Sequence, residues 1–236
     1  MISTRKVNAI FSKNMKTIFH NMFVSLPLIL APLMAFAFTR IPGVGDEAYQ
    51  MLPMFIIMNL FMSASTVVCT LMAEEKEKNT LGVLITSTVS VWDFLISILL
   101  IALFFTTISN IFVFFIVGAN ALLSIGLFMI ITTIAALPAA LFGAVIGIVS
   151  KNQMIASSII SPFFMALIFL PMFGADNALV NNVVYYFFTE QLTAGLIYAR
   201  DYSALPLMSL LIIGANALVF TVIFALFYKR RGLGMD

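Results

Sequence analysis

Long apolar segments dominate this sequence, and their length is what most limits how the chain can fold. A helix needs about 20 apolar residues to cross a bilayer, and helices that bond their own backbone groups are the simplest spanning structure. Apolar residues make up 62% of the chain and charged residues 9%, against about 45–50% apolar in soluble domains. We therefore expect one all-α, multi-pass membrane domain over residues 1–236, with six spans at about 22–39, 50–73, 94–117, 124–149, 155–173 and 206–228.

The basic residues predict how these spans are oriented. Residues 1–21 alternate basic and apolar positions at helical spacing, which is typical of a helix lying on a negatively charged leaflet. With six spans, ten of the 12 Lys and Arg fall on the side that holds both termini, and only Arg40 and Arg200 fall on the other. Because cytoplasmic loops are enriched in Lys and Arg, both termini are expected in the cytoplasm of a bacterial cell, with the chain in its plasma membrane.

A charged block at residues 74–81 stands out because long apolar segments lie on both sides of it. We expect the block to be in water and to begin a short amphipathic helix, with acidic residues in its first turn. In such a helix Glu74 and Lys78 form an i, i+4 ion pair, and Leu81 and Leu84 share an apolar face. The alternative is an ordinary solvated loop that joins two spans.

Several single residues carry structural rather than chemical predictions. Cys69 lies in an apolar run and is expected to pack in the core, and Asp93 is expected to cap the start of the third span. Gly143 and Gly147 have the spacing that permits close contact between helices. Residues 174–205 are too polar for a simple span and predict a re-entrant or surface-lying helical hairpin. Glu190 in this hairpin is either at membrane depth, as part of an external gate, or at the interface in water.

The motifs that the sequence lacks also narrow its function. It has no G-x-x-x-x-G-K-[ST] phosphate loop, no recognisable catalytic set and no cluster of metal ligands. The expected spans contain almost no charged residues, which disfavours an ion-coupled transporter. We therefore expect a chain that is not an enzyme, binds no cofactor or nucleic acid itself, and takes its energy from a partner.

The block and the residues after it resemble the type-2 ABC transporter permease family. Members carry E-E-K-E-x-x-T-L-x-x-L after the second span, which residues 74–84 match, followed by a T-S-P-V-S-like turn, which residues 86–90 match except that Thr88 replaces the proline. The chain also lacks the Gly-Lys pair that is usual a little later. The six-span layout, the basic N-terminal helix and the hairpin before the last span extend the resemblance over nearly the whole chain.

The resemblance implies an exporter subunit that works with a separate ATPase. Such a permease forms a homodimer or heterodimer in membrane lipid and docks two ATP-binding subunits, which hold the ATP and Mg²⁺. The segment that matches the family's coupling helix contains Glu74, Glu75, Glu77, Lys78, Thr80, Leu81 and Leu84. The acidic side chains are expected to pair with basic residues of the ATPase, and the leucines to fill its groove.

The cargo is expected to be hydrophobic or amphipathic: a drug, a lipid or a peptide. The spans are rich in Phe and Met, and a few polar residues within them are candidates for the translocation path. These candidates are Asn59, Ser63, Asn110, Ser157 and Asn216. A different class of function also fits the sequence, namely a membrane protein that binds and neutralises a toxin or peptide without pumping it.

Overall fold

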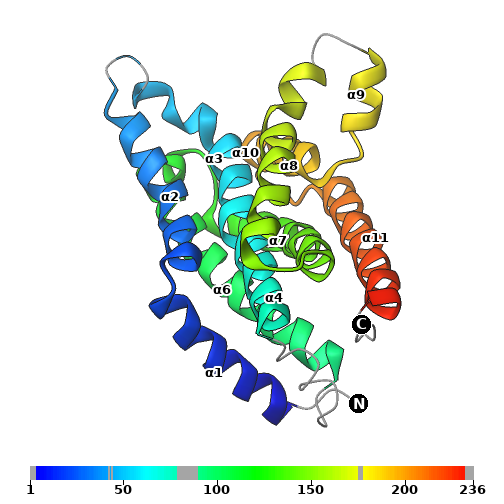
Figure 1. Cartoon of the computed structure of the whole chain (residues 1–236). Helices are drawn as coiled ribbons and strands as arrows, with labels where there is room; N and C mark the ends of the chain where they lie inside the picture. The colour runs from blue at the N-terminus through cyan, green and yellow to red at the C-terminus, as the bar shows by residue number, and fades with distance from the viewer. Residues whose placement is uncertain (1–3, 42, 44, 79–89, 175–177, 232–236) are drawn as a thin grey trace.

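The computed structural model of the chain is a bundle of helices and describes residues 4–41, 43, 45–78, 90–174 and 178–231 (Figure 1). The helices, in chain order, are α1 (Thr4–His20), α2 (Met22–Thr39), η1 (Gly45–Met51), α3 (Leu52–Asn59), η2 (Leu60–Ser65), α4 (Thr66–Glu77), α6 (Val91–Ile116), η3 (Ala119–Ala121), α7 (Ile125–Val149), α8 (Gln153–Gly174), α9 (Ala178–Val184), α10 (Phe188–Tyr202) and α11 (Leu207–Arg231). Helix α7 lies in the middle and packs against α4, α6 and α11.

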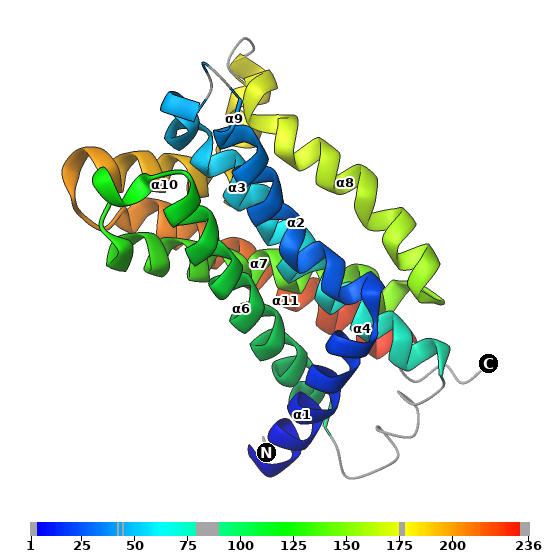
Figure 2. The ribbon, with the colours of Figure 1, turned by 90° about the vertical axis from the view of Figure 1, so that its left-hand side faces the viewer.

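The start of α1, the end of α4, the start of α6 and the end of α11 lie at one end of the bundle (Figures 1 and 2). Helix α9, the end of α2 and η1 lie at the other end. Four helices of the described chain are long and apolar enough to cross a membrane: Ala48–Glu77, Trp92–Ile116, Ile125–Val149 and Leu207–Lys229. The bent pair Thr4–His20 and Val24–Thr39, at 68°, would make a fifth span if the two form one. A helical membrane protein is thus confirmed at this coarser level.

Helix α1 is amphipathic, as the alternation of basic and apolar residues predicts. Val7, Ile10 and Ile18 are buried, whereas Arg5 and Lys16 on the other side are exposed. The buried side packs against α6, and Ser97 Oγ of α6 donates a hydrogen bond of 3.1 Å to the Val7 carbonyl oxygen. Helix α1 is therefore attached to the bundle along its apolar side.

The second predicted span is one continuous run of helix built from three pieces. Helices α3 and α4 are joined by the π-helical segment η2, and Thr66 Oγ1 of α4 donates to the Phe61 carbonyl oxygen of η2 at 2.9 Å. The run continues to Glu77, so the charged block does not begin a new helix within the described residues. That prediction is wrong for Glu74, Glu75 and Glu77, which end α4 instead. Acidic residues at a helix C-terminus oppose the helix dipole, so they need other partners.

Helix α7 crosses the second span at very short range, as the spacing of Gly143 and Gly147 predicts. A Cβ atom on Gly143 would lie 2.1 Å from the carbonyl oxygen of Ser65, and one on Gly147 would lie 2.9 Å from that of Cys69. Cys69 is fully buried at this contact, which confirms its place in the core. The glycines therefore let the two backbones touch, and this contact fixes α4 on α7.

The local features at the helix ends include one confirmed prediction. Ser90 and Asp93 form a capping box at the start of α6, which confirms the predicted role of Asp93. Gly118 adopts a left-handed φ of 72° in the turn before α7. The polar stretch after α8 contains two helices, α9 and α10, and a re-entrant or surface-lying hairpin there remains a prediction.

Candidate functional site

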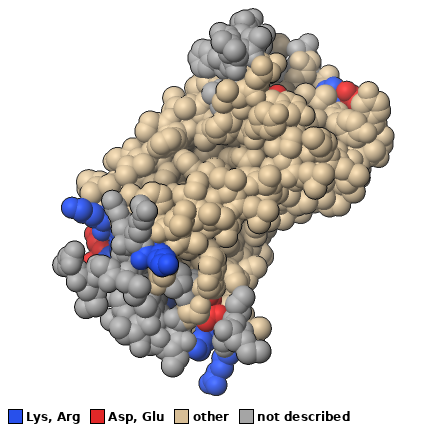
Figure 3. All heavy atoms as spheres, turned by 90° about the vertical axis from the view of Figure 1, so that its right-hand side faces the viewer, with Lys and Arg blue, Asp and Glu red and all other residues tan. Residues whose placement is uncertain are grey.

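Charged side chains gather at the end of the bundle where α4 stops. Figure 3 shows most of the blue and red atoms of the visible face at that end, an uncharged middle and a few charged atoms at the opposite end. Lys76, Lys78 and Glu77 belong to the charged end, together with the basic side of α1. This end is where the sequence places contact with a soluble partner.

Glu74 and Glu75 are not in water but are buried and paired within the chain. Their relative exposures are 7% and 5%. Glu75 forms a short ion pair with Lys13 of α1, and Glu74 pairs with Lys78 at 2.5 Å. The hydrogen bond from Lys78 to Glu74 also raises the pKa of the Lys78 ammonium. The expectation that the whole block is solvated is therefore wrong, because Glu74 and Glu75 are both buried: Lys13 of α1 pairs with Glu75, and Lys78 pairs with Glu74. The i, i+4 pairing of Glu74 with Lys78 is confirmed.

Lys76 and Glu77 each form a hydrogen bond with a backbone group at the end of another helix. Lys76 Nζ donates a hydrogen bond of 2.7 Å to the carbonyl oxygen of Ile148, in the last turn of α7. Glu77 Oε2 accepts a hydrogen bond of 3.2 Å from the backbone N–H of Gln153, the first residue of α8. A cation at a helix C-terminus and an anion at an N-terminus both complement the helix dipole.

Residues 74–78 and Lys13 thus connect α1, α4, α7 and α8, and we name this set the charged junction. Every one of its side chains makes a contact within the chain. Thr80, Leu81 and Leu84, which were expected to share the block's helix, lie outside the described residues. The end of α4 therefore cannot move without pulling on two helix termini and on α1.

Three of the five residues predicted for a translocation path meet in a buried polar cluster. Asn59 Nδ2 donates to Asn110 Oδ1 at 2.6 Å and to the Thr106 carbonyl oxygen at 3.2 Å. Its Oδ1 accepts from Ser63 at 2.6 Å and from Ser109 at 2.9 Å. The side chain of Asn59 is fully buried and joins α3 and η2 to α6. These hydrogen bonds hold α3, η2 and α6 together, and a role of the three residues in a translocation path remains a prediction.

Replacing Asn59 with alanine should destabilise the chain because it removes all four of these hydrogen bonds. Side-chain hydrogen bonds within membrane proteins contribute about 0.6 kcal/mol on average, so we expect a loss of about 2–3 kcal/mol. Thermal unfolding of the purified chain in detergent measures it. Asn216→Ala is the control, since Asn216 on α11 is only half-buried and donates to the carbonyl oxygens of Tyr186 and Ile212. Equal losses from both variants would contradict the role of the cluster.

The other two path candidates lie elsewhere. Asn216 is on α11, and Ser157 is on α8. Ser157 lines a polar pocket of about 610 Å³ beside the charged junction, together with Asn21, Thr70, Glu77, Asn152, Gln153, Met154, Ser158 and Ser161. The structure therefore does not bring the five candidates into one site.

Glu190 lies in the first turn of α10 and is half-buried. Its burial raises the pKa of its carboxyl group. An acidic residue in the first turn suits the helix dipole, which gives Glu190 a structural reason to be there. A gating role for it remains a prediction.

Comparison with known proteins adds no relative: no family model and no curated protein matches the chain. The site therefore rests on its own geometry. Sequence reasoning missed Lys13, Thr106 and Ser109 as partners, because they lie 62, 47 and 50 positions from the residues they contact. For Thr106 and Ser109 the only signal in the sequence is a polar side chain within an apolar helix, and Lys13 is one of several basic residues on the exposed side of α1.

Proposed function

We propose that the chain is the membrane-spanning permease subunit of an ATP-driven exporter of the type-2 ABC class. The charged junction is the observation that carries the proposal. Its residues 74–78 are the first part of the segment that resembles a coupling helix, and they connect the end of α4 to α1 and to the ends of α7 and α8. A displacement of residues 79–88 by a partner would thus reach four helices at once.

In this mechanism a separate ATPase subunit binds ATP and Mg²⁺ and docks on residues 79–88. Closure of the ATPase pushes on the end of α4, and the close contact at Gly143 and Gly147 transmits the push to α7. Two helices whose backbones are in contact move together as one rigid body, because no flexible side chains lie between them to absorb the movement. Two permease chains, identical or different, would then rearrange around a hydrophobic or amphipathic cargo.

The proposed topology uses α2, the run from α3 to α4, α6, α7, α8 and α11 as six spans of a bacterial plasma membrane protein. The described Lys residues of the junction and of α1 lie at one end of the bundle, whereas Arg40 directly follows α2 and Arg200 lies in the last turn of α10, both at the other end. This distribution supports a cytoplasmic location for both termini.

Leu84→Glu should weaken binding of the ATPase. In the proposed contact Leu84 fills an apolar groove, and burying a carboxylate there would weaken binding at least about tenfold. The measurement is recovery of a phosphate-loop ATPase with the tagged chain from its native membrane, with vanadate-sensitive ATP hydrolysis as the second readout.

Leu205→Glu is the matched control, because it adds one carboxylate at an exposed leucine between α10 and α11. It should leave ATPase recovery unchanged. If the wild-type chain is recovered alone and without ATPase activity, the exporter proposal fails, and a non-pumping protein that binds a toxin or peptide becomes the better account.

A further inference from the structure

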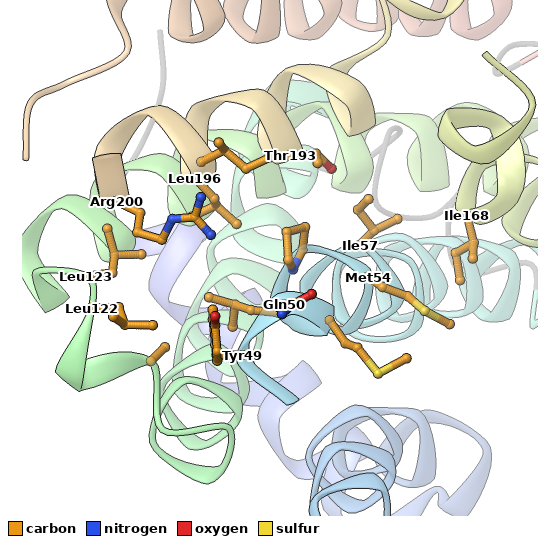
Figure 4. Close-up of a pocket in the computed structure, with 15 residues that line it drawn as sticks. Tyr49, Gln50, Met54, Ile57, Leu122, Leu123, Ile168, Thr193, Leu196 and Arg200 are labelled. Atoms are coloured by element: carbon orange, nitrogen blue, oxygen red, sulfur yellow. The ribbon is translucent and has the colours of Figure 1, made fainter. Parts of the chain in front are cut away.

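A second pocket of about 500 Å³ lies away from the charged junction. It is formed by η1 and α3, by η3 and the residues after it, and by α10, with Ile168 of α8 at its far side (Figure 4). Its volume is within the range of roughly 300–1,000 Å³ that is usual for sites of small molecules. The proposed function assigns nothing to it.

The walls of this pocket combine an apolar surface with a few polar groups. The apolar side chains include Met54, Ile57, Leu122, Leu123, Ile168, Leu196 and Ile197. The polar ones are Tyr49, Gln50, Thr193 and Arg200. Figure 4 shows the guanidinium group of Arg200 turned toward the pocket, with Tyr49 and Gln50 facing it from η1 and Ile168 at the far end. One end of the pocket is thus polar and cationic, and the rest is apolar.

Arg200 is held in a position that suits an oxyanion. Its Nε donates a hydrogen bond of 2.8 Å to Asp201 Oδ1, and this is the one hydrogen bond that the guanidinium makes to the described residues. Bonding at Nε fixes the plane of the group and leaves both terminal nitrogens for another acceptor. Two parallel N–H groups match a phosphate or carboxylate in a bidentate fork.

We propose that this pocket binds an anionic phospholipid, with the headgroup phosphate on Arg200 and the start of one acyl chain on the apolar wall. A soluble anion would use the guanidinium but not the apolar side chains, and a neutral lipid would use the apolar side chains alone. The site lies at the end of the bundle opposite the charged junction, beside exposed apolar residues such as Leu122 and Ile197. A phospholipid can therefore enter from the leaflet at that end and leave the rest of its chains outside.

Native mass spectrometry of the purified chain tests the proposal with phosphatidylglycerol and phosphatidylcholine of identical acyl chains. We expect the wild type to bind phosphatidylglycerol more tightly, and Arg200→Gln to weaken that binding about tenfold by removing charge-assisted hydrogen bonds. Arg40→Gln is the control and should change nothing: Arg40 lies over the ring of Phe36, at 4.8 Å from its centroid, and does not line the pocket.

A second pair of variants tests the apolar wall. Met54→Trp should fill the pocket and lower binding of phosphatidylglycerol, whereas Leu211→Trp, at a highly exposed position of α11, should not. Equal binding of both lipids by the wild type, equal effects of the two arginine variants, or unchanged binding in Met54→Trp would each overturn the proposal. So would displacement of the lipid by an equal concentration of inorganic phosphate.

Two further outcomes would also decide against a phospholipid. If Met54→Trp abolishes a dimer while lipid binding stays the same, the pocket belongs to a second copy of the chain. If a free fatty acid binds and phosphatidylglycerol does not, the headgroup assignment is wrong. The assay contains no ATPase subunit, so its result is independent of the proposed transport function.

Discussion

Gly143→Ala should destabilise the bundle far more than the loss of one glycine hydrogen suggests. The new Cβ would lie 2.1 Å from the Ser65 carbonyl oxygen and 2.8 Å from the Ser65 Cα, and these are backbone atoms of η2 that cannot rotate away. Helix α7 must then move off the second span, and the hydrogen bond from Ser65 Oγ to the Ala139 carbonyl oxygen is stretched. Overpacking of this kind costs about 1–3 kcal/mol, and a contact with backbone belongs at the upper end.

The measurement is thermal unfolding in detergent, followed by the fluorescence of Trp92, the chain's one tryptophan. For a chain of this size about 3 kcal/mol corresponds to a decrease in Tm of roughly 6–12 °C. Gly147→Ala should have a smaller effect, because its nearest contact would be 2.9 Å. Gly214→Ala on α11 is the control: its Cβ would meet nothing within 4 Å, so stability should stay the same or rise. An equal Tm for all three variants would contradict the close packing of α7.

The helices themselves could be predicted from the sequence, because each depends on local information. Length and apolar content alone place helices at 22–39 and 124–149, and α2 and α7 lie at Met22–Thr39 and Ile125–Val149. Asp93 and Gly143 were also predictable, since capping and small-residue spacing are short-range patterns. These short-range patterns do not identify the helix on the other side of a contact: the spacing of the glycines does not say which helix packs against them.

The charged block shows the limit of such reasoning. Read locally, residues 74–78 form the start of a solvated amphipathic helix, because charge favours water. In the structure Lys13 of α1, 62 positions away, forms an ion pair with Glu75. Lys76 bonds to the end of α7, and Glu77 bonds to the start of α8. A residue's charge is local, whereas the groups that neutralise it are set by the tertiary fold.

The polar cluster around Asn59 illustrates the same limit within the membrane. A translocation path and a buried network both require isolated polar residues in apolar helices, so composition cannot separate them. The π-helical segment η2 begins directly after Asn59, and Ser63 within it donates to the amide oxygen of Asn59. No sequence pattern predicts that change of helical pitch.

A variant of the charged junction should keep the docking of an ATPase but lose the transmission of its movement to α7 and α8. We expect the double variant Lys76→Met, Glu77→Gln to retain the partner ATPase, since it removes one positive and one negative charge and leaves residues 79–88 intact. It removes the cation from the α7 C-terminus and the carboxylate from the α8 N-terminus. Losing such a helix cap costs about 1 kcal/mol, so amide hydrogen exchange in the first turn of α8 should become roughly fivefold faster.

Transmission itself is measured by hydrogen exchange in the complex trapped with ATP and vanadate. In the wild type, trapping should change the exchange of the last turn of α7 and the first turn of α8; in the double variant this change should be lost while the ATPase still hydrolyses ATP. The matched control is Arg200→Met, Asp201→Asn, which likewise removes one positive and one negative charge without changing the net charge, at the opposite end of the bundle. If the double variant transmits the change as the wild type does, the junction is only a structural anchor, and movement must reach α7 through its contact with Ser65 and Cys69 alone.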